Sequence, residues 1–155
     1  ILRLTAKAPL LHGQLTSNVR LHQHRASQPL SNTPKVRVAM QSVLFISVED
    51  EEPDLILSFA LKPSAETSLT LIRTPKYESI LDESERGVSI SAGNSNLPMR
   101  NTLVSVHWTM DRVEIVSAYS RHTLDIASVD REEVEQAKLM LQIMNFDQRF
   151  QIHAA

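Results

Sequence analysis

Apolar and polar residues alternate along most of this chain, and this period of two constrains the fold more than any other feature. Successive side chains of a β-strand point to opposite faces, so such alternation is typical of strands with one buried face. In Thr102–Trp108, for example, the alternation places Trp108 on the inward face. The runs with this character are Gln14–His22, Lys35–Val48, Leu55–Leu61, Leu69–Arg73, Val88–Ala92, Thr102–Trp108, Val113–Tyr119 and Leu124–Val129.

Two of these runs, 43–48 and 55–61, flank a short acidic turn that contains Pro53. Alternating runs on either side of a turn predict an antiparallel β-hairpin. The first run is apolar on both faces, which is typical of a central strand and indicates a bulge near Ser42. Between the later runs, Tyr77–Glu85 lacks alternation and could form one or two turns of helix.

The period of the chain changes after Asp130. This residue is a good helix N-cap, and Glu132 and Glu133 would lie in the first turn, where carboxylates stabilise the helix dipole. Apolar residues then recur at intervals of three and four, which predicts one amphipathic helix over residues 130–146. The residues of this apolar stripe are Val134, Ala137, Met140, Leu141, Ile143 and Met144.

Seven or eight strands followed by one helix predict a mainly β fold with one C-terminal α-helix. A helix with one apolar face must bury that face against the sheet. We expect a small barrel or a strongly bent antiparallel sheet capped by the helix, which resembles the architecture of pleckstrin-homology-like domains. A two-layer α+β sheet is the alternative. At 155 residues the chain is predicted to be a single domain over 1–155, with residues 1–12 as an extended arm.

The charge of the chain is strongly asymmetric. The first 48 residues contain six lysines and arginines and no acidic residue, whereas the remainder holds ten basic and eighteen acidic residues. Five of those carboxylates fall within the segment 49–54. Such asymmetry bears on electrostatic partners rather than on the fold. The basic head either binds an anionic partner or is neutralised by the acidic hairpin of the same domain.

Composition excludes several classes of protein. There is no cysteine, so a disulfide framework, a thiolate metal site and a cysteine nucleophile are all excluded. Only three glycines occur, without the clustering that a dinucleotide fingerprint, a P-loop or a nucleophile elbow requires. No apolar run is long enough to span a bilayer. We therefore expect no cofactor, no transmembrane segment and a cytoplasmic location.

Two groups of histidines suggest chemistry. His22 and His24 would share one strand face, with His12 shortly upstream, and imidazoles arranged in this way could ligate zinc or copper. However, no carboxylate lies nearby in sequence to complete the site. In the second group, His122 precedes Asp125 by three residues and His107 lies on a neighbouring run. A histidine–carboxylate pair is the minimum for general base catalysis, so a hydrolase-like enzyme is a further alternative.

The basic residues Arg20, Arg25, Lys35 and Arg37 are the binding candidates. Arg25 followed by Lys35 and Arg37 resembles the loose basic pattern in the first loop of phosphoinositide-binding pleckstrin-like domains. The leading functional hypothesis is a non-catalytic protein–protein interaction or adaptor module. The first alternative is an anion-binding domain that uses these basic residues for phosphoinositide or nucleic acid. Self-association into a homo-oligomer is a further alternative.

Overall fold

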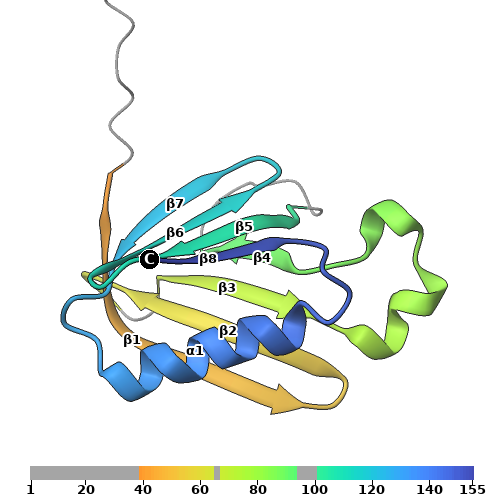
Figure 1. Ribbon diagram of the computed structural model, residues 1–155, viewed down its shortest axis with the longest axis horizontal. Coiled ribbons are helices and arrows are strands. Elements are labelled where there is room, and N and C mark those ends of the chain that lie inside the picture. The colour runs from red at the N-terminus through yellow and green to blue at the C-terminus, as the bar shows by residue number, and fades with distance from the viewer. Residues whose placement is uncertain (1–38, 65–66, 94–100) are drawn as a thin grey trace, which may run out of the picture. The chain divides into compact units, whose positions relative to one another are not determined.

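The computed structural model describes residues 39–64, 67–93 and 101–155, which belong to one compact unit, Val36–Ala155. The described residues form eight strands, one α-helix and two short 3₁₀ helices (Figure 1). In chain order they are β1 (Gln41–Glu51), β2 (Asp54–Leu61), β3 (Ser68–Arg73), η1 (Pro75–Ile80), η2 (Glu83–Glu85), β4 (Ser89–Ala92), β5 (Leu103–Trp108), β6 (Arg112–Ser117), β7 (Arg121–Asp125), α1 (Arg131–Met144) and β8 (Gln151–Ala154).

The predicted hairpin is confirmed. Strands β1 and β2 pair antiparallel from Glu51↔Asp54 at the turn to Val43↔Leu61 at the open end. The register shifts between Val43 and Phe45, so the predicted bulge lies one or two residues beyond Ser42. The irregularity lets both Val43 and Ile46 point into the core although they are three residues apart.

The strands form one sheet in the order β4-β3-β2-β1-β7-β6-β5-β8, and the sheet is not closed into a barrel. Most neighbours are antiparallel, but β1 pairs with β7, and β5 with β8, in parallel. The β1–β7 connection is short, because only Gln41 and Ser42 take part in it on the β1 side. An isolated bridge between Ser89 and Thr102 brings β4 back to the start of β5. The expected bent sheet is therefore present, with mixed rather than purely antiparallel pairing.

Helix α1 caps the sheet, as the sequence predicts, and packs on β1 and β2 (Figure 1). Its N-cap is Asp130, whose Oδ1 accepts a hydrogen bond from the amide of Glu132 at 2.8 Å. Strands β1–β4 and strands β5–β7 both contribute side chains to the core, and the helix covers it. The core side chains with the least exposure include Leu57, Phe59, Leu69, Leu71, Val106, Trp108, Val113, Ile115, Leu124, Ala137, Met140, Leu141 and Met144.

Two features differ from the sequence prediction. Strand β8 follows the helix and pairs with β5, although the sequence did not predict a strand in this run of only four residues. Ile143, which the helical periodicity assigns to the buried stripe, is 41% exposed. The apolar surface of the helix extends further around its axis than the sheet covers. Only one side of that surface is buried, and Ile143 lies on the uncovered side.

Candidate functional site

The outer edge of β1 is largely without a partner strand among the described residues. On one side β1 pairs with β2 along almost its whole length, whereas on the other side β7 pairs only with Gln41 and Ser42. The amide of Ile46 instead donates to Glu133 Oε2 of α1 at 2.8 Å. Backbone N–H and C=O groups alternate in direction along an antiparallel strand, so those of Val48 and Asp50 also turn away from β2. No strand among the described residues pairs with this part of the edge.

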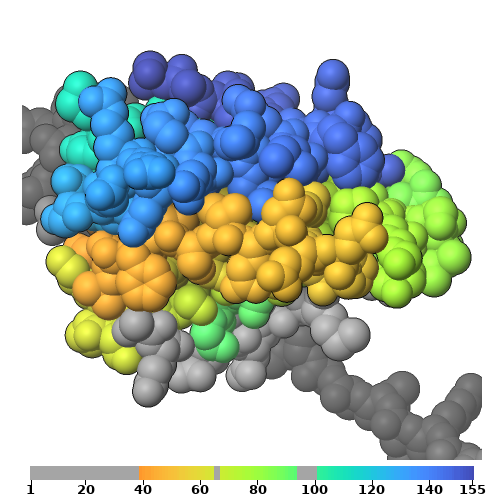
Figure 2. All heavy atoms as spheres, turned by 90° about the horizontal axis from the view of Figure 1, so that it is seen from below, coloured from red at the N-terminus to blue at the C-terminus, as the bar shows by residue number. Residues whose placement is uncertain are grey.

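A groove lies between this edge and α1. Its volume is about 240 Å³, and its lining residues are Val48, Asp50, Gln136, Leu139, Met140 and Ile143. Leu139 is 58% exposed, and Phe146, at the end of the helix, is 59% exposed. Figure 2 shows the face of the molecule on which α1 and β1 run side by side. The groove therefore combines an apolar helix wall with unpaired backbone groups, and we call it the β1/α1 groove.

The helix sequence explains why apolar side chains reach the surface here. Ala137, Met140, Leu141 and Met144 form the buried stripe. Leu139 and Ile143 are four positions apart on the helix, so they form a second stripe on an adjacent side, and Phe146 follows just past the helix end. A soluble helix that only caps a sheet needs one such stripe. The second stripe remains open along β1.

The charges around the β1/α1 groove are mainly negative. Glu49, Asp50, Glu51 and Glu52 are exposed at the end of the hairpin, and none forms an ion pair with a described residue. Asp50 also borders a second hollow of about 460 Å³, whose only basic lining residue is Lys76. No lysine or arginine lines the groove itself. Among the described residues, this end of the unit therefore carries an excess of negative charge.

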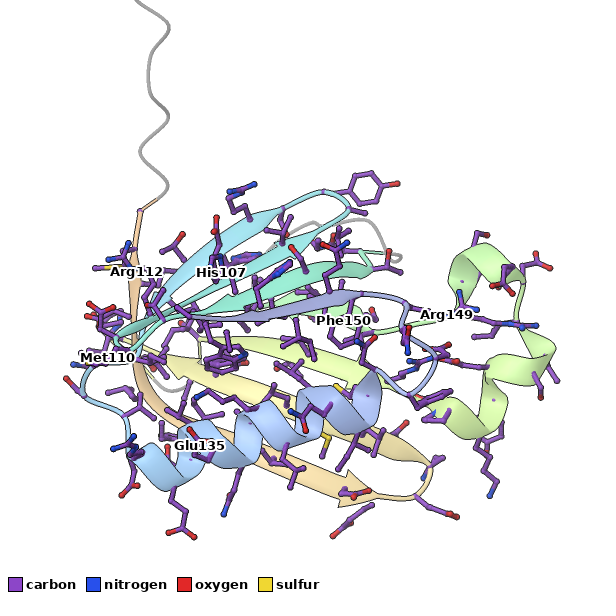
Figure 3. All side chains as sticks on the ribbon, in the orientation of Figure 1. His107, Met110, Arg112, Glu135, Arg149 and Phe150 are labelled. Carbon is purple, nitrogen blue, oxygen red and sulfur yellow. The ribbon has the colours of Figure 1, made fainter. Side chains whose placement is uncertain are left out.

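The basic residues of α1 lie on its other side. Lys138 pairs with Glu135 at 2.8 Å and sits over the ring of Trp108, 5.7 Å from its centroid. Glu135 is labelled on α1 in Figure 3. Arg131 and Lys138 line a separate hollow beside Thr109 and Met110. These cations therefore do not reduce the negative charge at the groove.

A buried ion cluster fixes the C-terminal end of α1. The Arg73 guanidinium is fully buried and donates to Glu78 from Nε and Nη2, each at 2.7 Å. It donates to Asp147 at 2.8 Å from Nη1 and at 2.7 Å from Nη2, and Nη1 also donates to the Met144 carbonyl. The ring of Phe146 lies 4.0 Å from the guanidinium carbon. All five N–H donors of Arg73 are thus used.

The protonation of the cluster follows from these contacts. Burial alone would lower the pKa of Arg73, but hydrogen bonds and charge attraction from Asp147 and Glu78 raise it. Burial would likewise raise the pKa of Glu78, yet the bonds from Arg73 and from the Gly87 amide hold it below its ordinary value. The Arg73 hydrogen bonds lower the pKa of Asp147 well below its usual range. All three groups are charged near neutral pH.

The cluster continues to the surface through Arg149. This side chain donates to Asp147 Oδ2 at 2.6 Å and to Glu83 Oε1 at 2.5 Å, and it points toward η2 (Figure 3). Sequence reasoning did not identify these residues. The sequence could have pointed to Arg73. This residue falls on the same strand face as Leu69 and Leu71, so its position predicts a charged side chain in the core.

The predicted catalytic residues are not brought together. His122 is half-buried on the core face of β7, and burial lowers its pKa. Its Nε2 lies 3.0 Å from Ser120 Oγ, within a hydroxyl network that holds the β6–β7 turn. Asp125 faces the other side of the sheet and accepts from the Ala127 amide at 3.0 Å. His107 is exposed on β5, opposite Trp108 as the alternation predicts, with its ring centroid 5.8 Å from that of His153 (Figure 3).

The remaining predicted site residues lie outside the described residues. They are the metal candidates His12, His22 and His24 and the binding candidates Arg20, Arg25, Lys35 and Arg37. Among the residues that the structure does describe, no three histidines or carboxylates are grouped so that they could hold a metal ion. Nor does that part of the chain contain a helix with the length and apolar character needed to cross a membrane.

No family model, curated protein or solved structure matches this chain. The candidate site is therefore assigned from its own geometry and chemistry.

Proposed function

We propose that this chain is a non-catalytic protein-interaction module, and that it binds a segment of its partner in the β1/α1 groove. The observation that carries the proposal is the unpaired outer edge of β1 beside an exposed apolar wall. Exposed strand edges accept an additional strand from a partner, and neighbouring pockets then select its side chains. Burial of Leu139 and Ile143 would supply the apolar contact area.

A hydrolase-like activity has less support. Catalysis by the predicted pair requires His122 and a carboxylate within hydrogen-bonding reach, but Asp125 faces away from His122. The contact of His122 with Ser120 stabilises the β6–β7 turn instead, because both residues belong to the hydrogen-bond network of that turn. The anion-binding alternative rests on Arg20, Arg25, Lys35 and Arg37, which lie outside the described residues. It stays a prediction from the sequence.

The proposal can be tested by selection of binders from a library of displayed random peptides, with the full chain as bait. We expect enriched peptides whose binding is lost in Leu139→Ser and Ile143→Ser. Met110→Ser and Ile80→Ser serve as matched controls, because these side chains are 99% and 81% exposed and lie outside the groove. Failure to enrich any peptide, or equal binding to all four variants, would contradict the proposal.

We further propose that the module acts in the cytoplasm, because a chain without cysteine is compatible with a reducing compartment. Fractionation of source cells with an antibody against the chain tests this location. Recovery in an organelle fraction would contradict it.

A further inference from the structure

We infer that the partner segment is extended and alternates apolar residues with lysine or arginine. This inference rests on the proposed function, because it names the chemistry of the ligand for the same groove. Three observations carry it: the direction of the free backbone groups, the two unlike faces that meet at the edge, and the charge around them.

The backbone groups require an extended ligand. The N–H and C=O groups of Val48 and of Asp50 point away from β2, and these two residues are two positions apart in the sequence. Two such groups, roughly 7 Å apart, match alternate residues of an added strand and do not match a helix. The Ile46 amide is already bound by Glu133. The added strand would therefore end beside Ile46.

The two faces of β1 require alternation in the ligand. On the helix side, the added strand would meet Leu139 and Ile143, which favour apolar side chains. On the opposite face, its neighbours would be Glu49 and Glu51, whose side chains alternate with those of Val48 and Asp50. Cross-strand neighbours of opposite charge stabilise a strand pair.

The charges also favour a cationic ligand over an anionic one. Glu49, Asp50, Glu51 and Glu52 form no ion pair with a described residue, and the groove is lined by no basic side chain. An acidic segment would meet like charges on the hairpin, which are destabilising when directly opposite. Basic residues in the ligand would instead be attracted before contact and paired after it.

The test uses four synthetic peptides and the full chain. The first alternates valine with lysine, the second replaces lysine by glutamate, and the third has the composition of the first in two blocks. The fourth is the first peptide with N-methyl groups on every other residue, which removes backbone donors from one edge. Fluorescence anisotropy gives Kd for each peptide at low salt and at about 0.5 M salt, where charge attraction is screened.

We expect the alternating basic peptide to bind most tightly and to weaken in high salt. N-methylation on the edge that faces β1 should weaken it at least about tenfold, because hydrogen bonds to Val48 and Asp50 are lost. The double variant Glu49→Gln with Glu51→Gln should weaken it about fivefold. The matched control, Asp82→Asn with Glu132→Gln, removes the same charge outside the groove and should leave Kd unchanged.

The outcomes separate this inference from the proposed function. If a peptide binds and Ile143→Ser abolishes binding, but the acidic or N-methylated peptide binds equally well, the interaction site stands and the ligand chemistry is wrong. If no peptide depends on Ile143, both are wrong. A dimer that Ile143→Ser dissociates, detected by sedimentation, would make a second copy the occupant and would also overturn the inference.

Discussion

At the scale of single residues, Arg73 links the sheet to the end of α1. Its guanidinium is removed from water, and its donors are shared among Glu78, Asp147 and the last turn of the helix. Burial of such a charge is tolerated only because every donor has an acceptor. Phe146 stacks on the guanidinium, so the end of the exposed stripe is held by the same contact.

Replacement of Arg73 by methionine should destabilise the fold by about 3–5 kcal/mol, because the buried carboxylate of Glu78 would lose its cationic partner, while the more exposed Asp147 would keep only Arg149. Urea denaturation measures the change. Arg86→Met is the matched control, since Arg86 pairs with the exposed Glu83 and should cost only about 0–1 kcal/mol. Equal effects of the two substitutions would show that the buried cluster contributes no special stability.

The same cluster predicts how stability depends on pH. Glu78 and Asp147 have lowered pKa values in the folded state, so the unfolded chain binds more protons in acid. Their contribution is fully present above their unfolded pKa values and is lost as pH falls through the folded ones. The free energy of unfolding should therefore drop below about pH 5. Arg73→Met should show a smaller drop in the same urea series, and an identical drop would contradict this assignment.

At the scale of elements, α1 carries two apolar stripes with different roles. The buried stripe closes the core, and the exposed stripe forms the wall of the β1/α1 groove. The sequence predicted the helix within two residues of its ends, because an N-cap and a period near 3.6 are local signals. It could not separate Ile143 from Met140, because that depends on where the sheet meets the helix.

Substitutions in the two stripes should separate stability from binding. Met140→Ala should cost about 2–5 kcal/mol, because it leaves a cavity in the core. Ile143→Ser should cost less than about 1 kcal/mol, because the side chain is largely exposed, yet it should abolish peptide binding. Thermal unfolding and anisotropy measure the two quantities. A large loss of stability in Ile143→Ser would mean that this side chain belongs to the core.

The strands show the same division between local and global signals. The β1–β2 hairpin was predictable because both runs alternate and their turn is short. Strand β8 was not predictable, because Gln151–Ala154 pairs in parallel with a strand more than forty positions earlier in the chain. The open edge of β1 could not be predicted from local sequence patterns either. It arises because β7 pairs with only the first two residues of β1.

At the scale of the whole molecule, the structure locates the acidic part of the charge asymmetry seen in the sequence. The acidic residues 49–52 are exposed beside the β1/α1 groove and form no ion pair within the described part of the chain. Whether the basic head neutralises them stays a prediction, since its arginines and lysines lie outside the described residues. The sequence indicated that charge matters for a partner, and we propose that a cationic partner binds at the acidic edge of β1.

The most direct test of this account is amide hydrogen exchange, detected by NMR, with and without the alternating basic peptide. The amides of Val48 and Asp50 face away from β2, so we expect them to exchange quickly in the free protein and to become protected in the complex. The amides of Ser47 and Glu49 already face β2 and should change little. Protection of Val48 and Asp50 alone would support strand addition at β1, whereas unchanged exchange at both amides in a saturated complex would contradict it.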